Sequence, residues 1–237
     1  MCTVTVVPVD DGFRMAFNRD EQRDRAAALP PAVHRLGERR AIFPVDPLSG
    51  GTWIGVNDRG LVCALLNRTV DASAPRPTSA RSRGLIVPAL LECDSFETTR
   101  AAVARIDPSS FDLFRLVIVH RLTVATVASD GRQLAVDTHH LSEPLLWASS
   151  GLGDDLVDAP RRALFESRVR RRPRSEWVDA QTRFHRHRWR DRSHVSVLMN
   201  RAKARTVSRT FVRVTPAGWT LRYHPIPPRS STANEAA

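Results

Sequence analysis

The second residue of the chain is a cysteine, and it stands at the start of the apolar segment TVTVV, residues 3–7. Methionine is usually removed when a small residue follows it, so removal of Met1 would leave Cys2 as the first residue. A cysteine in that position carries a nucleophile and a base, because the free α-amine has a pKa of about 7.7 to 8.0 and can take the thiol proton. The alternative is that Cys2 is a small buried hydrophobic residue, as single cysteines usually are. The residues that accompany it favour the catalytic interpretation.

The other two cysteines do not extend this chemistry. Cys63 and Cys93 have no C-x-x-C spacing, which argues against a metal site, and an odd number of cysteines argues against a disulfide framework. Cys63 lies within the apolar segment 61–66, so we predict that it is a buried packing residue. Cys2 is therefore the cysteine for which the sequence indicates a reaction.

Two predicted hairpins must position the groups that assist Cys2. Residues 2–7 and 13–17 are predicted strands, and the charged tetrapeptide Asn18-Arg19-Asp20-Glu21 ends the second of them and opens a charged, then Ala- and Pro-rich, loop. Residues 52–56 and 61–66 flank a tight polar turn at 57–60. Within the second hairpin, Trp53 and Gly55 either line a pocket beside Cys2 or shape the turn and pack the sheet.

The rest of the chain alternates between blocks of helix and strand. The predicted elements are a surface loop at 72–82, a helix at 85–91, a helix from a capping box of Asp94 and Glu97 to about Ile106, a β-meander at 114–122, 123–128 and 133–137, a mostly helical stretch at 160–192 broken at 172–174, and a hairpin of 206–214 and 219–223. This order predicts the α+β class with layered sheets. We predict a single domain over residues 1–224 and a disordered tail at 225–237, which is rich in Pro, Ser and Ala.

The net charge of +11 is concentrated in one segment. Residues 161–192 hold twelve Arg against four acidic residues and so carry +8 of the total. Arginines with interleaved aromatic residues are typical of nucleic-acid binding. However, Trp177, Ala180 and Phe184 recur at helical spacing, which favours a core stripe with the arginines on the solvent face. We therefore expect an anionic small ligand rather than a nucleic acid.

The sequence also bears on the location of the protein. No apolar run approaches the roughly 20 residues needed to span a bilayer. The N-terminus lacks the basic and then apolar pattern of a signal peptide. These observations predict a cytoplasmic protein without a membrane span, and they leave the oligomeric state open.

The motifs around Cys2 occur together in one known group of proteins. The chain resembles the NRDE family, also called the transport and Golgi organisation protein 2 family, which takes its name from the tetrapeptide at residues 18–21. Further matching segments are Met1-Cys2-Thr3, GGTWIG at 50–55, the turn at 57–61, ALLN at 64–67, RSRG at 81–84 and ARTV at 204–207. They follow the order of the family and extend over nearly the whole chain.

This family in turn is similar to the N-terminal-nucleophile hydrolases, above all to the cysteine enzymes that cleave bile-salt amides and penicillin V. The resemblance implies a four-layer αββα sandwich, and hydrolysis or transfer of an amide or other acyl group on a small ligand, with no cofactor or metal required. It also implies a set of site residues with distinct roles. These are Cys2 as the nucleophile, Arg19 as the group that holds the thiolate or the carbonyl, Asp20 as the partner of the α-ammonium group, Asn67 as an oxyanion donor, and Arg205 as a second cationic support.

The chain departs from those enzymes in two places. They have Arg before Asn in the charged cluster, whereas here Asn18 precedes Arg19. Because side chains alternate along a strand, this order could point Arg19 to the opposite face. Their second oxyanion donor is an Asn in the middle of the chain, and the corresponding region here is Ser149-Ser150-Gly151, where a hydroxyl would have to substitute.

A non-catalytic function is the alternative, because members of the family have been linked to haem trafficking and to lipid or acyl-CoA handling. Haem would need a His or Cys ligand. The candidates are His139, His140, His185 and His187, with Cys2 or Cys63 as a thiolate. No cysteine is followed by a proline, so the Cys-Pro dipeptide of haem-regulated proteins is missing.

Overall fold

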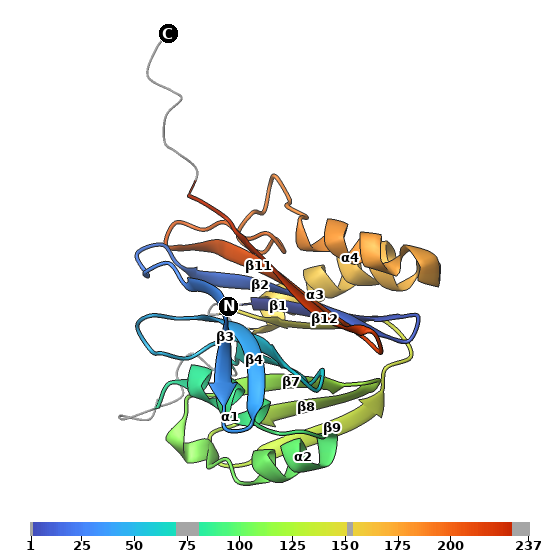
Figure 1. Cartoon of the computed structure of the whole chain (residues 1–237). Helices are drawn as coiled ribbons and strands as arrows, with labels where there is room; N and C mark the ends of the chain where they lie inside the picture. Colours follow the sequence, from blue (N-terminus) through green and yellow to red (C-terminus); the bar gives the residue numbers. More distant parts are fainter. Residues whose placement is uncertain (1, 70–80, 151–153, 229–237) are drawn as a thin grey trace.

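The computed structural model describes residues 2–69, 81–150 and 154–228. Two antiparallel sheets face one another and helices cover the outer face of each, so that the layers follow in the order helix, sheet, sheet, helix (Figure 1). This is the α+β sandwich that the sequence predicts. Within these residues, no helix has the length and apolar character needed to cross a membrane. The predicted loop at 72–82 lies almost entirely outside the described residues.

The first sheet, called the Cys2 sheet here, has five strands in the order β10-β1-β2-β11-β12. Their bounds are β1 (Cys2–Val9), β2 (Gly12–Gln22), β10 (Leu145–Ser149), β11 (Ala204–Thr215) and β12 (Gly218–Pro225). β1 lies between β10 and β2, so its backbone is paired on both sides. Val4 and Val6 pack in the core between the sheets, whereas Thr3 and Thr5 contact side chains from the helical layer. Cys2 is thus held at the end of a strand that is buried on both faces.

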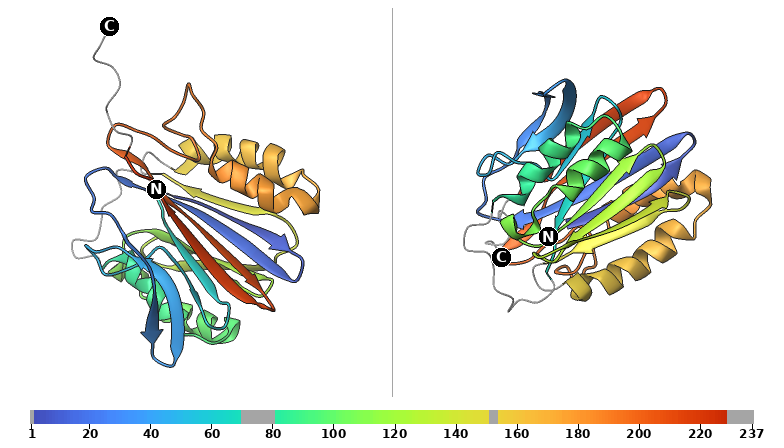
Figure 2. Two further views of the ribbon diagram at one scale, coloured as in Figure 1. Left: turned by 45° about the horizontal axis from the view of Figure 1, so that its top comes forward. Right: turned by 90° about the horizontal axis from the view of Figure 1, so that it is seen from below.

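The second sheet has seven strands in the order β3-β4-β5-β6-β7-β8-β9. Their bounds are β3 (Leu29–Leu36), β4 (Arg39–Val45), β5 (Ile54–Asn57), β6 (Val62–Asn67), β7 (Phe114–His120), β8 (Thr123–Ser129) and β9 (Leu134–His140). Both views in Figure 2 show the β3–β4 hairpin, in light blue, at one edge of this sheet. The apolar core between the sheets joins Phe13 and Phe17 of β2 to Ile54, Val62 and Leu66 of the second sheet.

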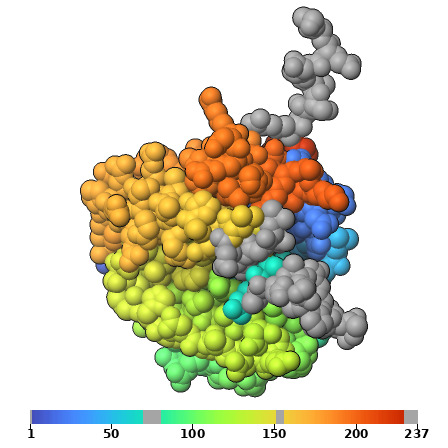
Figure 3. Space-filling model, turned by 180° about the vertical axis from the view of Figure 1, so that it is seen from behind, coloured from blue at the N-terminus to red at the C-terminus, as the bar shows by residue number. Residues whose placement is uncertain are grey.

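Two pairs of helices form the outer layers. α1 (Ile86–Leu91) and α2 (Phe96–Ala104) cover the second sheet, and fully buried Cys63 packs there as predicted. α3 (Asp154–Phe165) and α4 (Trp177–His185), with the π-helical segment η3 (Glu166–Arg170) between them, cover the Cys2 sheet. Ala180 and Phe184 pack against Val7 and Val9 of β1, with Trp177 beside them, so the predicted core stripe is confirmed. From behind, gold α3 lies beside the orange segment that follows α4 (Figure 3).

The structure corrects several predicted strands. β2 continues through the tetrapeptide at 18–21 to Gln22, whereas the prediction ended this strand at the tetrapeptide. The β3–β4 hairpin occupies much of the predicted Ala- and Pro-rich loop, and Pro30 and Pro31 are tolerated because β3 lies at the edge of its sheet. β10 has no counterpart among the predicted strands, although it pairs with the strand that carries Cys2.

Helix boundaries and the C-terminal end also differ from prediction. The capping box of α2 uses Ser95 and Thr98, which exchange hydrogen bonds between side chain and backbone, instead of Asp94 and Glu97. The predicted helical stretch at 160–192 begins earlier, at residue 154, and ends at residue 185. β12 reaches residue 225 and the next N–H group donates to the Val207 carbonyl, so backbone pairing extends past residue 224. Residues 229–237 of the predicted tail lie outside the described residues.

Candidate active site

Strand register brings Cys2 together with side chains from both neighbouring strands. Cys2 is directly opposite Arg19 of β2 and Ser149 of β10. Directly opposite residues of adjacent strands project to the same face of a sheet. The order of Asn18 and Arg19 therefore does not turn Arg19 away from Cys2. Asn18 faces the helical layer instead, where its amide donates to the carbonyls of His185 and Val197 at 3.0 and 2.8 Å.

Cys2 lines a cavity of about 180 Å³ where the ends of the two sheets meet. Arg19, Asp20 and Asn67 line the same cavity, so four of the five predicted site residues lie together. Trp53 is part of the lining and also packs in the core between the sheets, so both interpretations considered for this residue apply. Gly55 packs the sheet, because a Cβ atom at this position would lie 2.6 Å from the Leu91 side chain of α1.

The backbone nitrogen of Cys2 has a defined partner. It donates to Ser149 Oγ at 3.1 Å, and this is the nitrogen that would become the α-amine on removal of Met1. Ser149 thus positions the nitrogen, and its hydroxyl proton is still able to donate, so the expectation that a hydroxyl of this region replaces the missing oxyanion donor stays a prediction. Burial raises the pKa of the Cys2 thiol and the negative charge of Asp20 adds to the rise, whereas the Asp20 N–H and the Arg19 guanidinium oppose it. The thiol is therefore protonated at neutral pH and needs a base in order to react.

Asp20 lies just beyond the last residue pair of β1 and β2, which is Cys2 with Arg19. Its carboxylate accepts a hydrogen bond from Thr206 Oγ1 of β11 at 2.6 Å, and Arg161 Nη2 lies 3.8 Å from it. Burial raises the pKa of Asp20, and the positive charge of Arg161 opposes the rise. A carboxylate fixed in this way beside the N-terminal end of β1 is suited to hold an ammonium group.

Arg161 is a residue of this region that the sequence analysis did not identify. It projects from α3, is fully buried, and donates to Thr3 Oγ1 of β1 at 2.7 Å and to the carbonyls of Val195 and Ser196 at 3.0 and 2.7 Å. The prediction placed the arginines of 161–192 on the solvent face, and for Arg161 this is wrong. Arg161 occurs four residues from the buried apolar residues Val157 and Phe165. That i, i+4, i+8 spacing was the available signal of burial.

The Arg19 guanidinium is held by acidic and aromatic neighbours. Its Nη2 atom lies 2.6 Å from Asp46 Oδ2 and 3.2 Å from Glu21 Oε2, and the guanidinium carbon lies 4.2 Å from the Trp53 ring centroid. Burial alone would raise the pKa of Asp46, but the hydrogen bond from Arg25 and the charge of Arg19 lower this pKa below its usual value. Arg19 is therefore oriented by an ionised partner, and Asp46 is a further site residue that sequence reasoning missed.

Asn67 is the last residue of β6, and its exposed side chain lines the cavity. Among the described residues the side-chain amide has no hydrogen-bond partner, so its N–H groups can donate to a ligand. The adjoining wall is formed by Gly51 and Gly84, whose backbones approach so closely that a Cβ atom on Gly51 would lie 2.5 Å from Gly84. The Thr52 N–H donates to the Gly84 carbonyl at 2.9 Å, which fixes this wall.

Arg205 is not brought to this cavity. Its Nη1 atom donates to the backbone carbonyls of Ile226 and Thr206 at 2.6 and 3.3 Å. Arg205 therefore does not lie where a second cationic support of the site would have to lie. The cations close to Asp20 are instead Arg161 and Arg201, and Arg201 Nη2 donates to Ser150 Oγ at 3.3 Å.

Of the histidines considered as haem ligands, His185 is fully buried with both ring nitrogens in use. Nε2 lies 2.7 Å from Thr5 Oγ1 and Nδ1 lies 2.8 Å from Asn18 Oδ1. These bonds connect α4 to the two central strands of the Cys2 sheet. In the described ranges, no three His, Cys, Asp or Glu side chains are grouped as a metal site requires.

We expect the stability of the protein to fall below about pH 6.5 because of His185. Burial, with the charges of Arg14, Arg209 and Arg161, lowers its pKa well below 6.5, so the native state keeps the ring neutral while the unfolded chain takes up a proton. The stabilisation from this residue is present above the unfolded pKa and is lost as the pH falls. Urea unfolding at pH 7.5 and 5.5 should show a loss of about 1 kcal/mol. A His185→Gln variant with the same pH dependence would contradict this assignment.

Solved structures with the same fold are N-terminal-nucleophile hydrolases. Penicillin V acylase from Agrobacterium tumefaciens is 10% identical with a TM-score of 0.56, over 95% of this chain and 86% of that chain. The Caenorhabditis elegans ortholog of N-acylethanolamine-hydrolyzing acid amidase is 13% identical with a TM-score of 0.57, over 89% and 92%. A single-residue variant of conjugated bile acid hydrolase from Clostridium perfringens is 14% identical with a TM-score of 0.51, over 94% and 92%. At these identities the likeness concerns the fold.

Comparison by sequence gives the family. No curated protein matches the chain at a significant level. The family model for Transport and Golgi organisation 2 matches residues 1–217, which includes the strand that carries Cys2, the tetrapeptide at 18–21 and Asn67. The chain therefore belongs to the Transport and Golgi organisation 2 family.

Proposed function

We propose that the protein is an N-terminal-nucleophile cysteine enzyme that hydrolyses or transfers the acyl group of a small amide or other acyl compound. The observation that carries this proposal is the position of the Cys2 backbone nitrogen. It donates to Ser149 Oγ, and the Cys2 side chain lines one cavity with Asp20 and Asn67. This arrangement supports the proposal, because these groups can serve as nucleophile, base, base-positioning groups and oxyanion donor.

The reaction begins once Met1 has been removed. The α-amine of Cys2 takes the thiol proton as sulfur attacks the carbonyl carbon, and a C–S bond forms in a tetrahedral intermediate. The intermediate collapses with cleavage of the bond to the leaving group, which receives the proton from the ammonium group. Water then attacks the thioester and passes its proton to the amine, which releases the acid and restores the thiol. An acceptor amine or alcohol in place of water gives acyl transfer.

The neighbours of Cys2 assist different parts of this cycle. Asp20 stabilises the ammonium form of the α-amine, and Ser149 Oγ orients the nitrogen. Arg19, held by Asp46 over Trp53, places a positive charge on the Cys2 side of the sheet, which favours the thiolate and a developing oxyanion. The cavity of about 180 Å³ is smaller than a typical drug-sized site, so it suits a compact acyl group.

Asn67→Ala is expected to lower kcat/KM for an acyl substrate by about 10²- to 10³-fold, because the loss of one oxyanion donor typically costs that much. The exposed position of the side chain at the end of β6 predicts little effect on folding. Steady-state kinetics and thermal unfolding of the same preparation measure both quantities. An unchanged kcat/KM would remove Asn67 from the proposed site.

A trapping experiment tests the proposed function directly. The processed protein is incubated with a panel of small amides and activated acyl esters, and intact-mass and peptide analysis locates any acyl adduct. We expect one acyl group on the peptide that begins with Cys2. The matched control is a chain with a lysine inserted between Met1 and Cys2, which keeps its methionine and has no α-amine beside the thiol. This chain should lose turnover while its fold is retained.

Two outcomes would contradict the proposal. In one, a chain with a free N-terminal cysteine forms no adduct with any member of the panel. In the other, adducts form to the same extent on half-buried Cys93 and on Cys2. In either case a haem titration of the same protein, followed at the Soret band, would test the non-catalytic alternative.

A further inference from the structure

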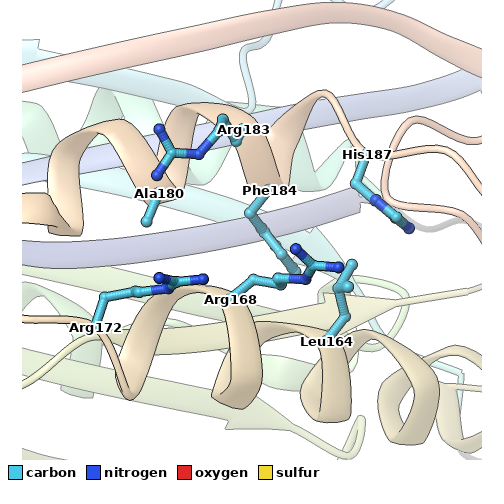
Figure 4. Close-up of a pocket in the computed structure, with 7 residues that line it drawn as sticks. All are labelled: Leu164, Arg168, Arg172, Ala180, Arg183, Phe184 and His187. Carbon is cyan, nitrogen blue, oxygen red and sulfur yellow. The ribbon is translucent and has the colours of Figure 1, made fainter.

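A second cavity lies in the outer helical layer, away from Cys2. It has a volume of about 170 Å³ and is bounded by the end of α3 and η3 on one side and by α4 on the other (Figure 4). It shares no lining residue with the Cys2 cavity. We call it the arginine cleft, because Arg168, Arg172, Arg183 and His187 line it.

The positions of these residues follow from helical spacing. Along α4, Ala180, Arg183 and Phe184 lie at i, i+3 and i+4 and form one set on one helix face, and His187 follows in the segment after the helix ends at His185. Leu164, Arg168 and Arg172 recur at intervals of four on the opposing segment. Figure 4 shows the two sets projecting from facing helices. Arg168 lies within η3, and π-helical turns of this kind are frequent at functional sites.

Two of the three arginines of the cleft, Arg168 and Arg183, lack the carboxylate partners that their neighbours have. Arg162 and Arg170, on the same helical stretch, are paired with Asp158, Glu143 and Glu166. In contrast, no acidic residue lines the cleft, and Arg168 and Arg183 form no ion pair within the described part of the chain. Arg172 has Glu176 at 3.9 Å. Three guanidinium groups around one cavity repel one another, and an anion bound between them would relieve this repulsion.

His187 adds a directional group to the cleft. Its Nε2 atom is buried and has no hydrogen-bond partner in the described residues. Burial, with the nearby charges of Arg168 and Arg192, lowers the pKa of His187, so the ring is neutral at pH 7. A neutral ring with its proton on Nε2 can donate one hydrogen bond to an anionic oxygen. A buried ring nitrogen without a partner therefore indicates that a ligand atom belongs there.

The floor of the cleft is apolar and rigid. Leu164, Ala180 and Phe184 form it, and Phe184 packs edge-to-face on Phe165 with ring centroids 5.3 Å apart. A bare inorganic ion would leave this surface uncovered, whereas a nucleic acid or a large partner would not fit a cavity of this size. The combination of guanidinium forks and an aromatic floor suits a small organic anion with a short apolar group.

We propose that the arginine cleft binds a small phosphate monoester, with its phosphate at the end lined by Arg168 and His187, its apolar substituent on Phe184, and Arg183 adding positive charge farther along the cleft. Phosphate matches the cleft because its three terminal oxygens can accept the Arg168 guanidinium fork and the His187 ring N–H together. This binding site is independent of the chemistry proposed for Cys2.

Calorimetric titration with phenyl phosphate tests the proposal on the full chain. We expect saturable binding that weakens as salt is raised from 50 to 200 mM, weaker binding of inorganic phosphate, and no binding of phenol. An Arg168→Gln/Arg183→Gln variant should lose at least tenfold in affinity. The matched control is Arg132→Gln/Arg190→Gln, which removes two exposed charges outside the cleft and should stay within twofold of the unmodified protein.

Thermal unfolding of each variant confirms that it is folded before titration. Equal loss in both double variants would mean that net charge alone attracts the anion, and it would overturn the proposal. A third arm uses vesicles that contain phosphatidic acid, whose headgroup is also a phosphate monoester. The proposed small-molecule site would be wrong if neither the unmodified protein nor any variant bound phenyl phosphate while the Arg168→Gln/Arg183→Gln variant lost vesicle binding. The surface would then be a membrane contact.

Discussion

Replacing Cys2 with alanine is expected to reduce acyl turnover by about 10⁴-fold or more, because removal of an activated nucleophile disables every later step of the cycle. Cys2 is almost fully buried, yet only the sulfur is lost, so we expect unfolding free energy to fall by about 1 kcal/mol. The large effect on turnover and the small effect on stability distinguish a catalytic thiol from a packing residue.

Three further variants sharpen this experiment. Cys2→Ser keeps the shape and the α-amine but has a weaker nucleophile, so it should also lose turnover. Cys63→Ala tests a fully buried thiol in the core of the second sheet, and should lower stability without a comparable loss of turnover. Cys93→Ala controls for a half-buried thiol outside the cavity and should retain full activity. Residual turnover by Cys2→Ala within tenfold of the unmodified protein would contradict the proposed nucleophile.

Arg161→Met is expected to lower the free energy of unfolding by about 3–5 kcal/mol, because removal of one partner leaves a buried charge without compensation. The guanidinium lies 3.8 Å from the Asp20 carboxylate and makes hydrogen bonds to β1 and to the chain after α4. The carbonyl groups of Val195 and Ser196 would lose these donors as well. Urea unfolding, followed by circular dichroism, measures the change.

The neighbouring Arg162 provides a matched control. Its side chain is half exposed and pairs with Asp158 on the helix surface, so Arg162→Met should cost no more than about 0.5 kcal/mol. A double-mutant cycle with Asp20→Asn isolates the interaction between Arg161 and Asp20, for which we expect a coupling of about 1–3 kcal/mol. If Arg161→Met and Arg162→Met were equally mild, Arg161 would not anchor the site.

Local patterns were sufficient to predict the part of the site that lies on hairpins. Cys2 and the tetrapeptide at 18–21 come from two strands joined by a short turn, so their proximity follows from the hairpin itself. Asn67 ends a strand of the second predicted hairpin. Its position near Cys2 depended on the family resemblance, because strand patterns do not specify how two sheets stack.

Residues contributed by distant elements were harder to predict. Asp46 follows an edge hairpin that the sequence analysis took for a loop, because Pro30 and Pro31 mark loops more often than strands. Ser149 ends a strand, β10, of only five residues without clear alternation. The burial of Arg161 was hard to recognise because its segment contains eleven other arginines, most of which are exposed. In each case tertiary packing decided the role of the residue.

The central placement of β1 has a consequence for the order of events during synthesis. Once β1 is paired with β10 and β2, Cys2 is almost fully buried at a strand end with neighbours on both sides, which leaves a processing enzyme little room around it. The proposed reaction therefore requires that methionine be removed while the N-terminus is still an extended nascent segment. β11, which supplies the Thr206 bond to Asp20, is translated almost two hundred residues later. In that reaction scheme the free N-terminus is made first, and the groups that surround Cys2 are assembled only when translation is nearly complete.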